Sequence, residues 1–375
     1  MAFCPFCFNE INLKTLNMRC SSISCLEPGT TEVHIIDRKK ARVDRHGFGT
    51  CDICGRTTHK LVCDSCGHDL PDTIRESETK IISIIGAKGS GKSYFVAALL
   101  RQIMEEGLLS YINDSSTMFI SDGREIYNKR YKKNMDDGVP LDGTRLVTNI
   151  VRDNPPVLAQ ITSAKQRGFG KGKSLVSYTY SFFDAAGESF SDPSVLASIT
   201  PYIAHSEAII FILDPRQIHE VNKAVSAVMP KLPPVSDDTY ENTVNSVADV
   251  IRNNKRLDSQ KAIKVPVCVA FSKWDLLINT PNLLPADFMI NNPNTFSFRG
   301  FNPDIIRNSG EEIRSLLRQW APGFLTTVEQ QFEDVMYFGF SAWGMGSKDG
   351  RNIPAIAPFR VEDPFLWILN RNGLL

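Results

Sequence analysis

The stretch from Ile81 to Ser93 limits the possible folds of this chain more than any other segment. Its residues are Ile-Ile-Ser-Ile-Ile-Gly-Ala-Lys-Gly-Ser-Gly-Lys-Ser. The first five residues are typical of a buried strand, and the stretch from Ser93 to Met104 has the apolar spacing of a helix. In the Gly-x4-Gly-Lys-Ser pattern between them, glycines allow the backbone N–H groups to converge on phosphate oxygens, and the helix adds its positive end. The sequence therefore predicts a phosphate-binding loop.

The residues of this loop have separate expected tasks. Lys92 is expected to reach the β- and γ-phosphates of a nucleotide and to support catalysis, and the Ser93 hydroxyl to ligate Mg²⁺. The backbone that would surround the phosphates comes from Gly86, Gly89, Ser90 and Gly91. Such a loop does not by itself distinguish GTP from ATP.

Strand-like runs alternate with longer helical stretches around this loop. The pattern predicts an α/β fold of the P-loop NTPase type, with a mostly parallel sheet flanked by helices. The expected strands are 81–85, 157–162, 175–183, 208–213, 267–271 and 336–340. The composition changes at about 71–80, so we expect a small module over 1–72 and a phosphate-loop domain over 73–375. Its long insertions are expected to contain helices, one of them at 311–320; they lie at about 105–150, 215–262 and 277–334.

Eight of the nine cysteines lie within the first 66 residues, in two blocks. A Cys-x2-Cys turn can present two thiolates to one tetrahedral zinc ion, and the glycines after two of these turns let them tighten. We therefore expect a double zinc ribbon with two four-cysteine sites, one per block. The first block is Cys4, Cys7, Cys20 and Cys25, and the second is Cys51, Cys54, Cys63 and Cys66. Disulfides are the less favoured alternative, because the N-terminus lacks a secretory signal and cytosolic thiols stay reduced.

The expected role of the zinc module is structural, since a fold this small gains its folding free energy from the metal. Nucleic-acid contact through the basic run 38–42 is possible but not favoured, because short charge runs are usually solvated. The same argument predicts a solvated helix face for the basic run 129–133. Phe6 and Phe8 are expected to pack in the module's own small core, and Cys268 in the core of the larger domain.

The overall charge gives no reason to expect nucleic acid or an anionic membrane as a partner of the whole chain, so any such contact would have to be local. Lys plus Arg and Asp plus Glu each number 42, so the formal net charge is zero. No global field therefore attracts the chain to nucleic acid or to an anionic membrane. The longest apolar runs are far shorter than the ~20 residues of a membrane-spanning helix. These features predict no membrane contact and a cytoplasmic location.

Three further segments each follow a predicted strand. They are Asp184-Ala-Ala-Gly187, Ser272-Lys273-Trp274-Asp275 and Ser341-Ala342-Trp343. Together with the phosphate loop and in this order, they resemble the DxxG, [NT]KxD and SAx motifs of TRAFAC-class P-loop GTPases, over about residues 80–375. The resemblance implies that Asp184 holds Mg²⁺ through water and that the Gly187 N–H contacts the γ-phosphate.

The last two segments would select the base. Guanine presents a ring N–H and an amine on one edge, and the Asp275 carboxylate can accept from both. Adenine lacks these donors and would leave the carboxylate unpaired, which can give strong discrimination. The Lys273 stem would lie on the base plane and the Ala342 N–H would donate to the guanine carbonyl. Ser272 and Ser341 complete the two base-binding segments.

The chain also departs from the pattern of these GTPases. Ser272 replaces the usual Asn or Thr, so the bracing of its loop is expected to be weaker. Glu188 stands where many GTPases have Gln; it is a candidate to orient the attacking water, although its charge would face the γ-phosphate. Thr144 and Thr148 are both candidates for the threonine that ligates Mg²⁺, with Thr148 preferred.

No arginine finger can be assigned from the sequence; Arg145 and Arg167 are merely near in the chain. Without an arginine in cis, hydrolysis is expected to be slow and to need a partner.

The zinc ribbons, the insertions and the C-terminal run 361–369 resemble the Double-GTPase proteins of bacterial conflict systems. This implies a GTP/GDP switch that works with partner proteins, with phage defence as the candidate process. The run itself fits an amphipathic helix capped at Asp363 with Pro364 at its first position. A nucleotide-binding scaffold with little turnover and an ATPase remain as alternative functions.

Overall fold

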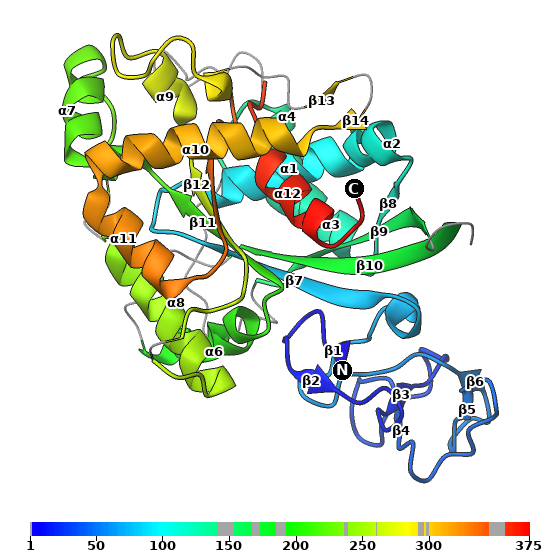
Figure 1. Ribbon diagram of the computed structural model, residues 1–375. Coiled ribbons are helices and arrows are strands. Elements are labelled where there is room, and N and C mark those ends of the chain that lie inside the picture. Colours follow the sequence, from blue (N-terminus) through cyan, green and yellow to red (C-terminus); the bar gives the residue numbers. More distant parts are fainter. Residues whose placement is uncertain are drawn as a thin grey trace.

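The computed structural model describes residues 2–141, 154–166, 173–184, 193–235, 239–259, 261–291, 296–297, 300–344 and 357–375. A seven-stranded sheet with helices on both faces forms the larger part, and cysteine-rich loops lie beside it (Figure 1). The fold is the expected one: a mostly parallel α/β sheet flanked by helices, with a small N-terminal cysteine-rich part. Within the described residues, no helix has the length and apolar character needed to cross a membrane.

The strands lie in the order β15-β12-β11-β7-β10-β9-β8. Their bounds are β7 Glu78–Ile85, β8 Ser116–Phe119, β9 Val157–Gln166, β10 Lys173–Asp184, β11 Ala208–Leu213, β12 Val267–Phe271 and β15 Val335–Gly339. Five pair with their neighbours in parallel, whereas β9 pairs antiparallel with β10, and β8 pairs antiparallel with β9 at the edge of the sheet. Each predicted strand is present. The edge strand β8 was not predicted, because its four residues are too few to show a periodic pattern.

Alternate residues of each strand point to opposite faces, and each face has its own helical cover. Ile82 and Ile84 of β7 pack with the helices on one face of the sheet: α1 (Lys92–Met104), α2 (Leu108–Asn113), α3 (Gly123–Tyr127), η2 (Asn128–Lys132), α4 (Lys133–Asp136) and α12 (Asp363–Arg371). Ile81 and Ile85 pack with those on the other face: α6 (Pro193–Ala204), α7 (His219–Val228), α8 (Tyr240–Lys255), α9 (Trp274–Ile278), α10 (Pro303–Trp320) and α11 (Pro322–Gln331). Short elements complete the larger part: η1 (Asp72–Arg75), η4 (Pro215–Gln217), η5 (Met289–Asn291), β13 (Phe296–Ser297) and β14 (Gly300–Phe301).

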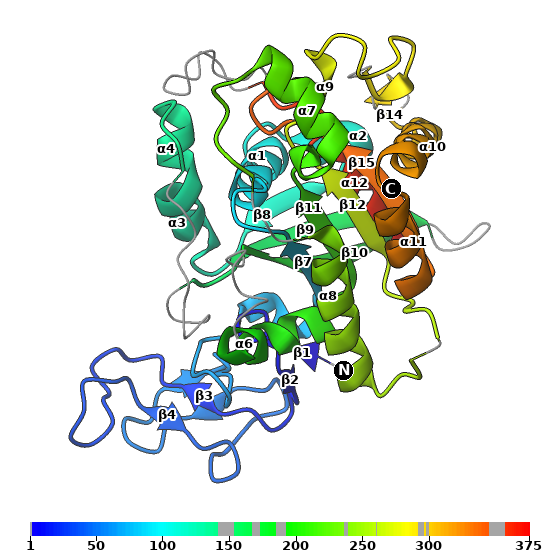
Figure 2. The same ribbon diagram turned by 90° about the vertical axis from the view of Figure 1, so that its left-hand side faces the viewer.

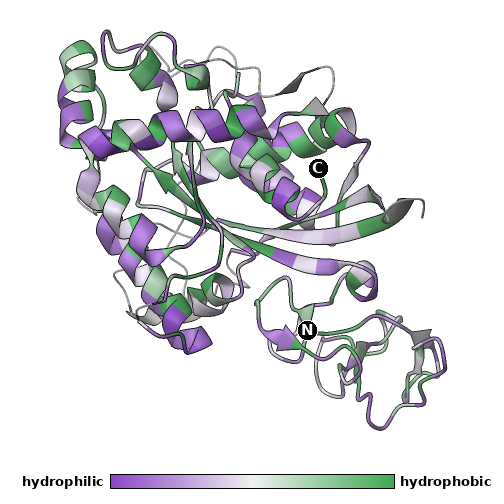
Figure 3. Ribbon diagram, in the orientation of Figure 1, coloured by the Kyte–Doolittle hydropathy of each residue, from purple (hydrophilic) through white to green (hydrophobic). Residues whose placement is uncertain are grey.

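Burial follows the hydrophobic pattern. The central strands β11 and β12 are buried along their whole length and appear hydrophobic in Figure 3. Cys268 lies in β12 and is fully buried, as predicted. The predicted face of Ile313, Leu316 and Leu317 is also buried, but its helix begins earlier, at Pro303, where the side chain of Asn302 caps it.

The last helix differs from its prediction. It begins at Asp363 rather than after it, and residues 363–369 are all buried instead of forming an amphipathic face. It is covered on all sides because it packs on the sheet next to α10 and α1.

The N-terminal part consists of two-residue strands joined by turns: β1 (Ala2–Phe3), β2 (Glu10–Ile11), β3 (Met18–Arg19), β4 (Ile35–Ile36), β5 (Gly49–Thr50) and β6 (Thr57–Thr58). Phe6 packs among the cysteines there, as expected. The prediction for Phe8 is wrong, because its ring lies in the core of the larger part. It sits 4.9 Å from the ring of Tyr202 and 5.8 Å from that of Phe183, measured between ring centroids. The turn that carries it lies directly against β10, where the Ser181 hydroxyl donates to the Pro5 carbonyl at 2.9 Å.

Candidate functional site

The phosphate loop follows β7, whose neighbours are β10 on one side and β11 on the other. The strand order reverses at this place, and ligands of open α/β sheets bind there, outside the carboxyl ends of the strands. Gly89 and Gly91 have φ angles of 74° and 102°, in the left-handed region that favours glycine. A Cβ atom at Gly86 would lie 2.2 Å from the carbonyl oxygen of Ile212. The conformation of the loop therefore requires glycine at all three positions.

Two polar side chains are enclosed by this loop. The Lys92 ammonium donates to the carbonyl oxygens of Gly86 at 2.8 Å and Ala87 at 2.9 Å. The Ser90 hydroxyl is buried, and no hydrogen-bond partner for its Oγ is found in the described part of the chain. Buried polar groups are normally paired. Both groups are suited to phosphate oxygens as acceptors, so the loop fits a nucleotide by its own chemistry.

Asp184 ends β10 and is in register with Ile84, just before the loop. The side chain of Asp184 is buried; its Oδ2 accepts from the Tyr131 hydroxyl at 3.5 Å, and its backbone carbonyl accepts from Asn154 Nδ2 at 2.6 Å. A carboxylate beside the phosphate loop is where a magnesium ion between the phosphates and the protein would be held. The other predicted residues of this region lie outside the described residues: Thr144, Arg145, Thr148, Arg167, Gly187 and Glu188.

Lys273 joins two of the predicted segments. Its ammonium donates to the carbonyl oxygen of Gly89 at 2.9 Å and to Asp214 Oδ2 at 2.6 Å. The Cβ of Ser272, one residue earlier, would be 3.4 Å from a Cβ added at Gly91. The segment predicted to bind the base thus lies directly against the phosphate loop.

The third segment lies against the second. The Ser341 hydroxyl donates to Asp275 Oδ1 at 2.5 Å, and the Trp274 N–H donates to the Phe340 carbonyl at 3.0 Å. Ser341 thereby fixes the orientation of the Asp275 carboxylate. Beyond Ala342, the ring of Trp343 lies 5.1 Å from the ring of Tyr94 on α1, so this segment also returns to the phosphate-loop helix.

Sequence reasoning missed Asp214 and Arg216, which follow β11. Asp214 is buried and pairs with Arg216 at 2.7 Å as well as with Lys273. Burial raises the pKa of Asp214, but the hydrogen bonds and charges of Arg216 and Lys273 outweigh it and leave the pKa below its usual value. An ionised Asp214 therefore holds the Lys273 ammonium in place. An acidic residue directly after a buried strand, as at Asp184, was the available signal.

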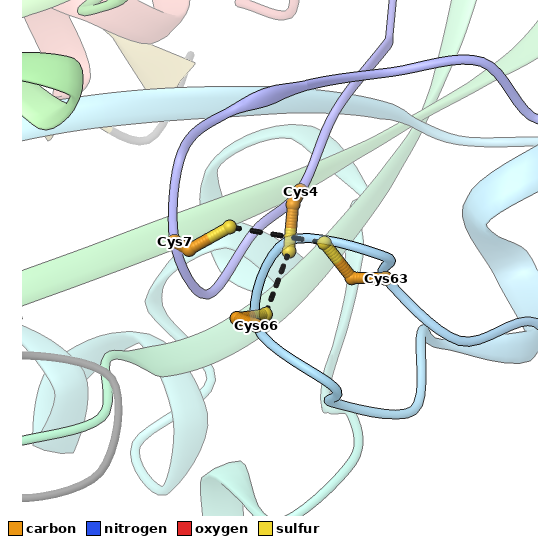
Figure 4. Close-up of side chains that lie close together, drawn as sticks. All are labelled: Cys4, Cys7, Cys63 and Cys66. Atoms are coloured by element: carbon orange, nitrogen blue, oxygen red, sulfur yellow. Dashed lines mark hydrogen bonds between the residues drawn. The ribbon is translucent and has the colours of Figure 1, made fainter.

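The cysteines form two groups, but not one per block. One group is Cys4, Cys7, Cys63 and Cys66, and the other is Cys20, Cys25, Cys51 and Cys54; within each, the sulfur atoms lie within 4.8 Å of one another. Figure 4 shows the four side chains of the first group converging. The predicted grouping is therefore wrong, and one site is nested inside the other along the chain.

Long-range backbone pairing explains the nesting. Met18 bridges Leu61, and the Arg19 N–H donates to the carbonyl of Lys60 at 2.9 Å. This pairing brings the chain back on itself, so the outermost cysteine pairs meet and the inner pairs close between them. The sulfur separations fit zinc: a tetrahedral ion with Zn–S bonds of ~2.3 Å places its sulfur atoms about 3.8 Å apart. Four cross-pair distances are 3.8, 3.8, 3.7 and 3.4 Å.

A double substitution tests the nested arrangement. Cys20→Ser with Cys54→Ser removes two ligands of the inner group and leaves the outer group complete. We expect the purified variant to lose one of two zinc ions in metal analysis. Cys20→Ser with Cys66→Ser, which takes one ligand from each group, should weaken both sites. If the first variant instead lost both ions, the nested grouping would be refuted.

The comparisons with known proteins give distant relatives. No protein-family profile matches the chain. It is 24% identical over 334 residues to SaeC of Mycolicibacterium smegmatis, which carries the name ESX-1 scaffolding and assembly protein; the match covers 84% of this chain and 80% of SaeC.

Solved structures with partial likeness include Sup35 and the Ski7 GTPase-like domain. The chain aligns with Sup35 complexed with GMPPNP at 11% identity and a TM-score of 0.28, over 72% of this chain and 39% of that one. It aligns with the Saccharomyces cerevisiae Ski7 GTPase-like domain bound to GDP and inorganic phosphate at 14% identity and a TM-score of 0.31, over 79% and 51%. The alignment with the GTP-bound Ski7 domain has 11% identity and a TM-score of 0.30, and it covers 79% of this chain and 51% of that one. The chain thus spans about half or less of these proteins, and at such scores the likeness adds nothing to the site described above.

Proposed function

We propose that this chain binds GTP with Mg²⁺ and hydrolyses it, and that the bound nucleotide acts as a conformational switch within an assembly of proteins. The contact of Lys273 with the Gly89 carbonyl, at 2.9 Å, carries this proposal. One ammonium joins the base-binding segment to the phosphate loop. The triphosphate and the base of a single nucleotide can therefore be held at the same time.

The phosphate side of the site has a clear division of tasks. The loop N–H groups and Lys92 bind the β- and γ-phosphates, while Ser93 and Asp184 hold Mg²⁺, which neutralises charge on those phosphates. Thr148 as the switch threonine, Gly187 at the γ-phosphate and Glu188 beside the attacking water remain predictions. In the proposed switch, these residues contact the γ-phosphate site before hydrolysis and release it afterwards.

On the base side, Asp275 accepts from the ring N–H and the amine of guanine, and the Ala342 N–H donates to the guanine carbonyl. Ser341 holds the carboxylate of Asp275 at 2.5 Å. The weaker bracing expected for Ser272 is offset in part, since its hydroxyl donates to the Leu213 carbonyl at 3.2 Å. These groups match the donors and the carbonyl of guanine, whereas adenine presents no ring N–H to Asp275.

Asp275→Asn should change the base preference. Asparagine can donate to the second carbonyl of xanthine but repels the amine of guanine, so affinity should shift from GTP to XTP. With one buried hydrogen bond to a charged group at stake, about 1.5–3 kcal/mol, a change of ~10-fold or more is expected for each nucleotide. Competition against a fluorescent guanine nucleotide measures this shift. Asp304→Asn, on an exposed turn of α10, is the matched control. A variant that still prefers GTP would contradict the role of Asp275.

The relative SaeC is named for scaffolding and assembly, which favours protein partners for this chain. That name also supports the second candidate function, a nucleotide-binding scaffold with little turnover. Single-turnover hydrolysis of bound GTP separates the two: a switch converts it to GDP, whereas a scaffold retains GTP. The ATPase alternative, the Double-GTPase resemblance with its role in phage defence, and the cytoplasmic location stay predictions.

A further inference from the structure

The helical turn η2, residues 128–132, is π-helical and packs against the phosphate-loop helix α1. Figure 2 shows α3 and α4, which flank it, beside α1. Turns of this type are rare and occur frequently at functional sites. The sequence predicted a solvated basic face here. Lys129 and Lys133 are exposed, as predicted. Tyr131 between them is fully buried, however, and Lys132 is paired with Glu105 and Asp136.

This turn reaches the nucleotide site through Tyr131, whose hydroxyl donates to Asp184 Oδ2 at 3.5 Å. The neighbouring guanidinium of Arg130 lies over the Tyr131 ring, with its Cζ 5.8 Å from the ring centroid. The ring of Tyr131 thus connects the Arg130 guanidinium with the carboxylate that ends β10.

One hydrogen-bond donor of the Arg130 side chain is buried and, within the described part of the chain, unpaired. Its Nη1 is buried, yet it has no hydrogen-bond acceptor among the residues that the structure describes. Stacking on a ring does not satisfy it, because the N–H groups lie in the guanidinium plane. Leaving a buried donor of a charged group unpaired costs ~1–3 kcal/mol or more. Arg130 precedes Tyr131, which contacts Asp184, so this donor is suited to an anionic acceptor that arrives with the ligand.

We propose that Arg130 donates to the γ-phosphoryl group in the transition state of GTP hydrolysis and supplies in cis the arginine that the sequence did not reveal. This inference rests on the proposed function. In hydrolysis, the water oxygen bonds to the γ-phosphorus, and the bond from that phosphorus to the bridging oxygen breaks with its electron pair staying on GDP. One proton of the water stays on the inorganic phosphate, and the other is released to solvent. Charge that develops on the γ-phosphoryl and bridging oxygens is stabilised by the guanidinium.

Single-turnover hydrolysis by the full, zinc-loaded chain tests the role of Arg130. Arg130→Ala and Arg130→Lys should both lower the rate by ~10³-fold or more, since lysine lacks the planar fork of donors. Their affinity for GTP and GDP should stay within a few-fold of wild type. Arg124→Ala is the control, because Arg124 is an exposed residue on the adjacent helix α3 that stacks on Phe119.

Phosphate analogues separate a catalytic role from a structural one. Wild type with GDP should bind both beryllium fluoride, a ground-state mimic, and aluminium fluoride, a transition-state mimic. Arg130→Ala should lose only the aluminium fluoride complex. Wild-type hydrolysis rates in the variant, an equal loss of both complexes, or a wild-type chain that forms no aluminium fluoride complex by itself would each overturn the inference. Failure of the wild type to bind GTP would instead overturn the proposed function.

Discussion

Lys92→Ala should lower the affinity for GTP and GDP by at least about 100-fold. The ammonium is buried inside the loop, held by the carbonyls of Gly86 and Ala87, so it is already placed for the β- and γ-phosphates. A hydrogen bond between charged groups contributes about 1.5–3 kcal/mol, and loss of two such bonds corresponds to a factor of ~150 or more. Fluorescence anisotropy of a labelled guanine nucleotide measures the loss.

The matched control for this variant is Lys264→Ala. Lys264 is exposed and precedes β12. It therefore lies at the amino ends of the parallel strands, whereas the phosphate loop lies at their carboxyl ends. The Lys264→Ala variant should bind nucleotide like wild type, and both variants should have the far-UV circular dichroism spectrum of the wild-type chain. If Lys92→Ala bound GTP as tightly as wild type, the assignment of the phosphate loop would have to be abandoned.

Phe8→Ala should lower the free energy of unfolding of the larger part by about 3–5 kcal/mol, the usual cost of removing a buried ring. The cavity would open beside Tyr202, whose hydroxyl donates to the carbonyls of Ile82 and Phe183 at 2.5 and 3.0 Å and accepts from the N–H of Ile84 at 2.9 Å. These contacts connect β7 and β10, the strands that end in the phosphate loop and in Asp184. The N-terminal module therefore contributes to the core behind the nucleotide site.

Denaturant unfolding of the zinc-loaded chain measures this effect. Phe6→Ala is the matched control, since the Phe6 ring packs among the cysteines and against His68, 4.9 Å away. The Phe6→Ala substitution should destabilise the N-terminal module and leave the denaturant midpoint of the larger part unchanged. Chelation of zinc should act like Phe8→Ala on that midpoint, because it frees the turn that carries Phe8. Equal and small effects of both phenylalanine substitutions would show that the shared core contributes little.

Local patterns in the sequence predict much of this site, because each motif follows its own strand. The strand over 81–85 and the glycines of the loop could be placed from periodicity and spacing, and the polar residues at the ends of β10, β12 and β15 from their resemblance to GTPase motifs. Their convergence follows from the rule that the carboxyl ends of parallel strands share one edge of the sheet. The contact of Lys273 with Gly89 agrees with that expectation.

Features that depend on distant pairing could not be predicted. The cysteine pairs have nearly the same local spacing, so only the pairing of Met18 with Leu61 decides which pairs meet. Phe8 lies in the larger core because its turn rests on β10, which no local pattern shows. Arg130 lies in a basic run that is typical of a solvated face, and no local pattern shows that its neighbour Tyr131 is buried.

Competition between nucleotides tests the central claim most directly, because it requires the phosphate loop and Asp275 to act on one ligand. With Mg²⁺ present, unlabelled GTP and GDP should displace a fluorescent guanine nucleotide from the wild-type chain, and at least about 100-fold more ATP should be needed, since adenine leaves the Asp275 carboxylate unpaired. Displacement by ATP and GTP at similar concentrations, or no binding of the guanine nucleotide, would contradict the account.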